Sequence, residues 1–134
     1  MNPKPRTILY VDDDPDDREL LSELLRTEEP GVDVILAPDG IRAIEYLNAT
    51  NSGAAERPAL IILDINMPFI DGTELFRQLR SDDRFRNIPV LMYSSSENPS
   101  DRQHFQCQGA MFISKPDTLA YMRSIARVML AQAV

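Results

Sequence analysis

The sequence predicts an α/β fold in which helices cover both faces of a five-stranded parallel sheet. Five short apolar runs recur along the chain, and they are continuous rather than alternating, as strands buried on both faces require. Between these runs lie segments whose apolar residues are spaced three and four apart, which is typical of helices with one buried face. Strands that alternate with helices in this way form a doubly wound parallel sheet.

The elements follow one another in a regular order. The apolar runs predict strands at residues 7–11, 32–37, 60–63, 90–93 and 111–113. Apolar stripes predict helices that include residues 20–25, 41–47, 75–79 and 119–130. A further helix is expected at residues 99–108, where the segment is polar and only Phe105 marks an inner face.

Turn and cap residues agree with these boundaries. Aspartate followed by proline or glycine is expected to open the first three helices, because its side chain caps free backbone N–H groups. These pairs are Asp14-Pro15, Asp39-Gly40 and Asp71-Gly72, and the last two helices are expected to start at Asn98-Pro99 and Pro116-Asp117. Residues 49–58 are expected to form the longest surface connection.

A five-stranded sheet of this kind commonly has the flavodoxin-like order 2-1-3-4-5, with right-handed crossovers. Polar residues then gather at its carboxyl edge. Asp12 and Asp13 end the first strand, Asp64 ends the third, Ser94 ends the fourth, and Lys115 follows the fifth. Because ligands of such sheets bind at the carboxyl edge, these five side chains are expected to form one site.

The residue types at this edge predict metal-dependent phosphoryl chemistry. Three neighbouring carboxylates repel one another unless they bind protons or a cation, and oxygen ligands favour Mg²⁺. Asn66 is expected to supply a backbone carbonyl as a further metal ligand. Asp64 can then act as a nucleophile toward a phosphoryl group, while Lys115 and Ser94 stabilise the phosphoryl oxygens.

Composition limits the other possibilities. The 134 residues, 43% of them hydrophobic, are expected to form a single domain at 1–134 with no output domain. A net charge of −7 argues against nucleic-acid binding and against a basic membrane patch. No leader or membrane-spanning run is evident, so we expect a cytoplasmic protein. We assign no role to Cys107.

Four segments resemble the receiver domain of response regulators in two-component signalling. They are ILYVDDDP at 8–15, LIILDINMPFIDG at 60–72, IPVLMYSSS at 88–96 and GAMFISKP at 109–116. The resemblance implies that Asp64 accepts a phosphoryl group from a histidine kinase, and that Asp12, Asp13, Asp64 and the Asn66 carbonyl surround Mg²⁺. It also implies that Ser94 and Phe112 act as switch residues and that Lys115 is joined to Pro116 by a cis peptide.

The resulting hypothesis is a stand-alone response regulator rather than an enzyme, with self-catalysed phosphorylation and dephosphorylation. It would signal through a downstream protein target, and an activated form could pair as a homodimer. One alternative is a phosphorelay intermediate that passes its phosphoryl group to a histidine carrier. Another is a small phosphohydrolase, although Asn66 replaces the expected general acid. A flavin-binding module is disfavoured because Asp12, Asp13 and Asp14 would repel a flavin phosphate.

The other acidic residues after the first strand receive a simpler interpretation. Asp14, Asp16 and Asp17 precede or begin the first helix, where the helix dipole favours negative charge. His104, the only histidine, is expected to face solvent.

Overall fold

The computed structural model describes residues 5–95 and 99–134, which form alternating strands and helices. The strands are β1 (Thr7–Val11), β2 (Asp33–Ala37), β3 (Leu60–Leu63), β4 (Val90–Ser94) and β5 (Met111–Ser114). The helices are α1 (Pro15–Glu28), α2 (Gly40–Asn51), α3 (Gly72–Ser81), α4 (Pro99–Cys107) and α5 (Leu119–Gln132). This alternation confirms the predicted element order.

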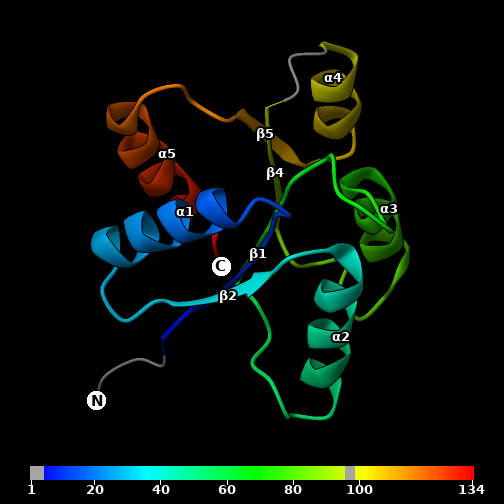
Figure 1. Ribbon diagram of the computed structural model, residues 1–134. Coiled ribbons are helices and arrows are strands. Elements are labelled where there is room, and N and C mark those ends of the chain that lie inside the picture. The colour runs from blue at the N-terminus through cyan, green and yellow to red at the C-terminus, as the bar shows by residue number, and fades with distance from the viewer. Residues whose placement is uncertain (1–4, 96–98) are drawn as a thin grey trace.

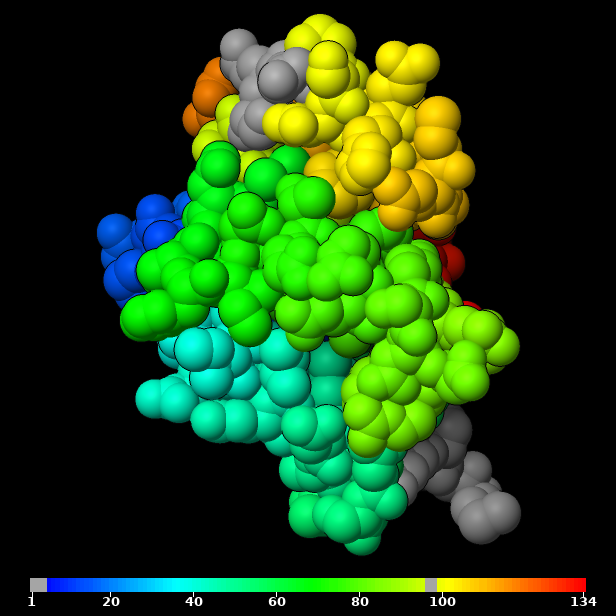
Figure 2. Space-filling view, turned by 90° about the vertical axis from the view of Figure 1, so that its right-hand side faces the viewer, coloured from blue at the N-terminus to red at the C-terminus, as the bar shows by residue number. Residues whose placement is uncertain are grey.

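The five strands form one parallel sheet in the predicted order β2-β1-β3-β4-β5. Figure 1 shows α1 and α5 on one face of the sheet and α2, α3 and α4 on the other. Each face has its own apolar core, because β1, β3 and β4 are buried on both sides. Figure 2 shows the outer side of the second layer, which α2, α3 and α4 cover together. No helix in the two described ranges is long and apolar enough to cross a membrane.

Most boundaries agree with the sequence. The Asp14, Asp39 and Asp71 side chains accept backbone N–H groups at the starts of α1, α2 and α3, as predicted. The polar fourth helix is present, and Phe105 is its buried residue. Asn98, the expected start of that helix, lies outside the described residues.

Several other boundaries differ by one residue, and two were wrong by more than that. Helix α2 continues to Asn51, so the surface connection begins later than residue 49, and the Thr50 hydroxyl donates to the Leu47 carbonyl within the extended helix. Helix α5 begins at Leu119 rather than at Pro116-Asp117, because the Thr118 side chain accepts the Tyr121 N–H and acts as the cap.

The loop between β3 and α3 brings the backbone after Asp64 against the start of α3. The Gly72 N–H donates to the Ile65 carbonyl at 2.7 Å. A Cβ atom placed on Gly72 would lie 2.0 Å from the Asp64 carbonyl oxygen and 2.8 Å from the Ile65 Cα. Both neighbours are backbone atoms, so Gly72 is required by close packing and fixes the chain that carries Asp64.

We predict that Gly72→Ala lowers the free energy of unfolding by about 2–4 kcal/mol, because the new methyl group displaces the backbone at Asp64. Urea denaturation measures this change. Gly53→Ala is the matched control: Gly53 has a φ of +80° but no atom within 4 Å of the added Cβ. It should cost only the left-handed strain, about 1 kcal/mol. Equal losses in the two variants would contradict the close-packing argument.

Candidate phosphoacceptor and metal site

Three carboxylates meet at the carboxyl edge of the sheet, as the sequence predicts. The parallel ladder pairs Val11 of β1 with Leu63 of β3, so the residues that follow these two leave the sheet side by side. One carboxylate oxygen from each of Asp12, Asp13 and Asp64 lies within 4.8 Å of the others. Asp12 and Asp64 are buried, whereas Asp13 is exposed. This set of oxygen ligands suits a hard divalent cation such as Mg²⁺.

Lys115 reaches the same cluster from the end of β5, an edge strand of the sheet. Its backbone N–H donates to the Ser94 carbonyl at 2.9 Å, which extends the β4–β5 ladder by one residue. The Nζ atom lies 2.8 Å from Asp12 Oδ2, 2.8 Å from Asp17 Oδ2 and 3.4 Å from Asp64 Oδ2. One ammonium group is therefore shared among three carboxylates.

Asp12 is held by several donors. Its Oδ2 atom accepts from the Tyr10 hydroxyl at 2.6 Å as well as from Lys115, and its Oδ1 atom accepts from the Asp14 N–H at 3.0 Å. These bonds compensate a carboxylate that is completely buried. Three donors already use most of the acceptor capacity of Asp12, so the exposed Asp13 is better placed to contact a cation directly.

The environment of Asp64 disfavours its ionised form. Burial raises the pKa of this carboxyl, the Lys115 charge opposes that shift, and the Asp12 charge adds to it. Hydrogen bonds from Ser94 and Lys115 favour the carboxylate but do not cancel the rise in pKa. A bound cation would relieve this penalty, since it attracts the ionised form.

Lys115 remains charged despite its partial burial. Burial alone would lower its pKa, but hydrogen bonds to Asp12 and Asp17 and the charges of Asp12 and Asp64 raise the pKa above its ordinary value. The phenol of Tyr93 lies beneath this cluster, with its ring centroid 5.7 Å from Lys115 Nζ, and burial raises its pKa to about 12. The site therefore holds a permanent cation beside a carboxylate.

The remaining predicted residues differ in how they relate to this cluster. Ser94 is buried at the end of β4 and bonds to Asp64. Asn66 is exposed in the following loop, and its role as a carbonyl ligand stays a prediction. Phe112 is buried on β5 and stacks on Phe105 with ring centroids 6.2 Å apart.

The expected cis peptide before Pro116 is wrong for this structure, because the described residues contain no cis peptide bond. The trans isomer is the more stable form of an X–Pro bond unless its surroundings select the other.

Two residues of the site were missed by sequence analysis. Tyr10 could have been found, because side chains two apart on a strand share a face and Tyr10 precedes Asp12 by two. Asp17 was interpreted as a dipole-favoured acid of the first turn, but its carboxylate also pairs with Lys115. That contact depends on how α1 lies beside the β5–α5 connection, which the local sequence does not specify.

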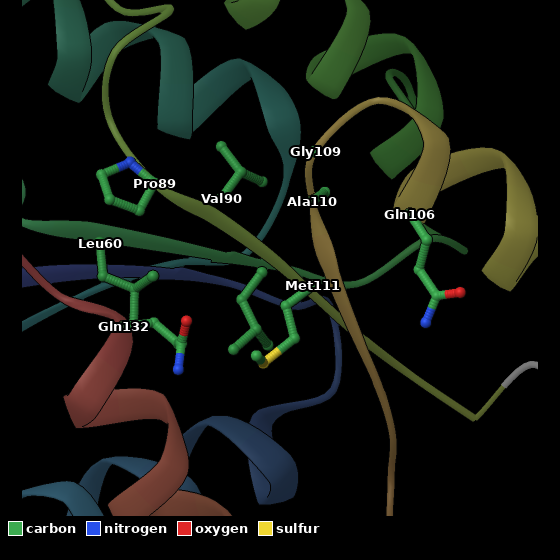
Figure 3. A pocket seen from close by; sticks show the side chains of 9 residues that line it. Leu60, Pro89, Val90, Gln106, Gly109, Ala110, Met111 and Gln132 are labelled. Carbon is green, nitrogen blue, oxygen red and sulfur yellow. The ribbon is translucent and has the colours of Figure 1, made fainter.

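A separate pocket lies at the opposite edge of the sheet. It is lined by residues that begin three strands, Leu60, Val90 and Met111, together with Gln106 and Gln132 (Figure 3). Because these are the amino ends of parallel strands, the pocket is remote from the carboxylate cluster. It contains none of the predicted site residues.

The protein has a doubly wound α/β sheet, with three carboxylates and a lysine at its carboxyl edge. These features define a class of phosphoacceptor domains, and comparison with known proteins gives the same class. Residues 8–127 match the family model described as the response regulator receiver domain. The chain is 34% identical over 98 residues to response regulator Rcp1 of Synechocystis sp., covering 72% of this chain and 67% of Rcp1. It is 35% identical over 131 residues to response regulator Rre1 of the same organism, covering 96% of this chain but only 53% of Rre1.

Solved structures give the same result. The phosphorylated cyanobacterial phytochrome response regulator RcpA superposes with a TM-score of 0.84 and 30% identity, covering 97% of both chains. The Mn²⁺-bound form of Rcp1 superposes with a TM-score of 0.83 and 26% identity, covering 95% of this chain and 93% of that one. The chain belongs to the response regulator receiver domain family, whose members accept a phosphoryl group from a histidine kinase and bind Mg²⁺ in an acidic pocket.

The raised pKa of Asp64 predicts how stability responds to pH without Mg²⁺. The folded-state pKa exceeds the ordinary value of 3.8, so ionising this carboxyl costs more free energy in the folded chain than in the unfolded chain. Asp64→Asn should therefore be more stable than wild type at neutral pH. The advantage should disappear as the pH falls through the raised pKa toward 3.8.

Urea denaturation at a series of pH values, with a chelator present, measures this difference. Asp83→Asn is the control, because that side chain is 83% exposed and its ion pair with Arg86 lies on the surface. It should change stability by no more than about 0.5 kcal/mol. A neutral-pH stability of Asp64→Asn below that of wild type would contradict the electrostatic account.

Proposed function

We propose that Asp64 is the phosphoryl acceptor of this receiver domain and that Asp12 and Asp13 complete its Mg²⁺ site with the Asn66 carbonyl. The observation that carries this assignment is the position of Asp64: it shares Lys115 with Asp12 and lies within 4.8 Å of both other carboxylates. Among the described residues, these three carboxylates form the only acidic group able to hold a metal ion.

The transfer step follows from these contacts. A carboxylate oxygen of Asp64 attacks the phosphorus atom, the P–N bond to the histidine of the kinase breaks, and the imidazole leaves with the electron pair. Lys115 lies 3.4 Å from Asp64 Oδ2 and can donate to a phosphoryl oxygen attached there. Ser94 already bonds to Asp64 and can donate to a second. Mg²⁺, when bound, would neutralise part of the charge on the phosphoryl group.

The same residues can transmit the change. Ser94 leaves its hydrogen bond to Asp64 when it turns toward a phosphoryl oxygen. Ser94 pairs with Ser114 of β5, and Phe112 lies two residues before Ser114 on the same strand, so Phe112 moves in response. We propose that these two residues alter the surface around α4 and β5, and that a downstream protein or a second copy of the chain recognises it. Self-catalysed dephosphorylation belongs to the same proposal. No specific observation favours the phosphohydrolase, the onward phosphorelay or the flavin module.

Incubation with acetyl phosphate and Mg²⁺ tests the acceptor assignment. Wild type should gain the mass of one phosphoryl group, because a small donor needs only the nucleophile, the cation and Lys115. Asp64→Ala should gain none, and Asp83→Asn should be labelled like wild type. Intact-mass spectrometry measures the mass gained by each of the three proteins. Equal labelling of Asp64→Ala, or an unlabelled wild type, would sink the proposal.

Mg²⁺ should also stabilise the unphosphorylated protein. A ligand that binds only the folded state adds about 1.4 kcal/mol when its free concentration is roughly ten times its dissociation constant. We expect this gain in the urea unfolding of wild type, and a clearly smaller gain for Asp13→Asn, which removes an exposed ligand. Asp83→Asn should retain the full gain. If Mg²⁺ stabilises Asp13→Asn as much as wild type, Asp13 is not a ligand of the ion.

A further inference from the structure

Asp17 is the member of the lysine cluster that the acceptor chemistry does not use. Lys115 has three N–H donors, and three carboxylates surround its Nζ atom. Asp12 and Asp64 belong to the group that can hold a cation, whereas Asp17 does not. Its oxygen is nevertheless 2.8 Å from Nζ, closer than the 3.4 Å of Asp64. The Lys115 ammonium therefore lies nearer to Asp17, which is outside the proposed metal site, than to Asp64, the proposed acceptor.

The fold fixes Asp17 in this place. Asp14 caps α1 and accepts the Asp17 N–H, and Arg18 donates from its guanidinium to the Asp12 carbonyl at 2.7 Å. These bonds attach the first turn of α1 to the end of β1, and α1 packs beside α5. Lys115 is only 14% exposed and Asp17 is 35% exposed, so the pair is partly shielded from solvent. Shielding strengthens an ion pair relative to one on the open surface.

We propose that Asp17 restrains Lys115 and thereby slows phosphorylation of Asp64. This inference rests on the proposed function of Asp64. The lysine assists transfer by neutralising charge on the phosphoryl oxygens, and a second anion at 2.8 Å offsets part of its positive charge and occupies one of its donors. Asp17 is thus a positioning residue that acts through Lys115.

The competing interpretation is an ordinary ion pair that stabilises the fold and has no effect on the reaction. The two interpretations differ in the rate of phosphorylation. If Asp17 only stabilises the fold, removing its charge leaves that rate unchanged apart from a weaker repulsion of the anionic donor. If Asp17 restrains Lys115, removing it frees the cation and raises the rate.

Asp16 provides the matched control. It precedes Asp17 in the first turn of α1, carries the same charge and is exposed. Asp16→Asn therefore reproduces the change in net charge, but the described ion pairs of Lys115 stay intact. Asp17→Asn should react with acetyl phosphate in saturating Mg²⁺ roughly three- to tenfold faster than Asp16→Asn. Asp17→Ser, whose shorter side chain is less able to hold the ammonium, should behave similarly.

A double-mutant comparison tests whether the effect passes through the lysine. In a Lys115→Gln background all variants should react slowly, and Asp17→Asn should no longer exceed Asp16→Asn. Initial rates come from intact-mass spectrometry, and circular dichroism checks that each variant is folded.

The outcomes separate the two proposals. An unlabelled wild type refutes the assignment of Asp64 and this inference with it. A labelled wild type with equal rates for Asp17→Asn and Asp16→Asn refutes the restraint alone, as does an Asp17→Asn protein that reacts more slowly. Persistence of the acceleration in the Lys115→Gln background also overturns it.

Discussion

The burial of two neighbouring carboxylates is the constraint on which the site depends. Asp12 is fully buried and Asp64 is only 6% exposed, and the charge of Asp12 adds to the cost of ionising Asp64. A buried charge without partners costs several kcal/mol, so the fold must bring compensating groups to the same edge. Lys115 supplies the opposite charge, while the Tyr10 hydroxyl and the Asp14 N–H complete the hydrogen bonds of Asp12. Without Lys115, the two buried carboxylates would lose this counter-ion.

The backbone holds these groups together without using their side chains. The β1–β3 ladder sets Asp12 and Asp64 side by side, and the β4–β5 ladder extends to the Lys115 N–H. The loop after Asp64 is closed by the Gly72 N–H, and a side chain larger than hydrogen does not fit at that position. Phe69 in the same loop has a φ of 67°, a strained conformation for a bulky residue, and it is 80% exposed. Tight closure of this loop therefore has a conformational cost close to Asp64.

The sheet and its polar edge could be predicted from the sequence because both depend on local patterns. Continuous apolar runs mark strands buried on both faces, and residues directly after them must reach the carboxyl edge of a parallel sheet. The contact of Asp17 with Lys115 could not be predicted from such patterns, because it depends on the packing of α1 near a residue 98 positions away in the chain. The end of α2 also escaped prediction, because Ala49, Thr50 and Asn51 resemble a loop in composition but continue the helix. Residues whose roles arise from long-range packing cannot be identified from spacing alone.

The charges at this edge explain why phosphorylation should reorganise it. Lys115 pairs with Asp12, Asp17 and Asp64, and Asp13 lies beside two of these, so the four carboxylates and one ammonium carry a net charge of about −3 when all are ionised. A divalent cation reduces this to about −1, but an aspartyl phosphate restores about one negative charge. The new charge sits on phosphoryl oxygens beyond the Asp64 carboxylate, out of reach of the bonds that now satisfy the cluster. If Asp64 is the acceptor as proposed, Ser94 and Lys115, which already contact it, are the donors that we expect to move toward the new charge.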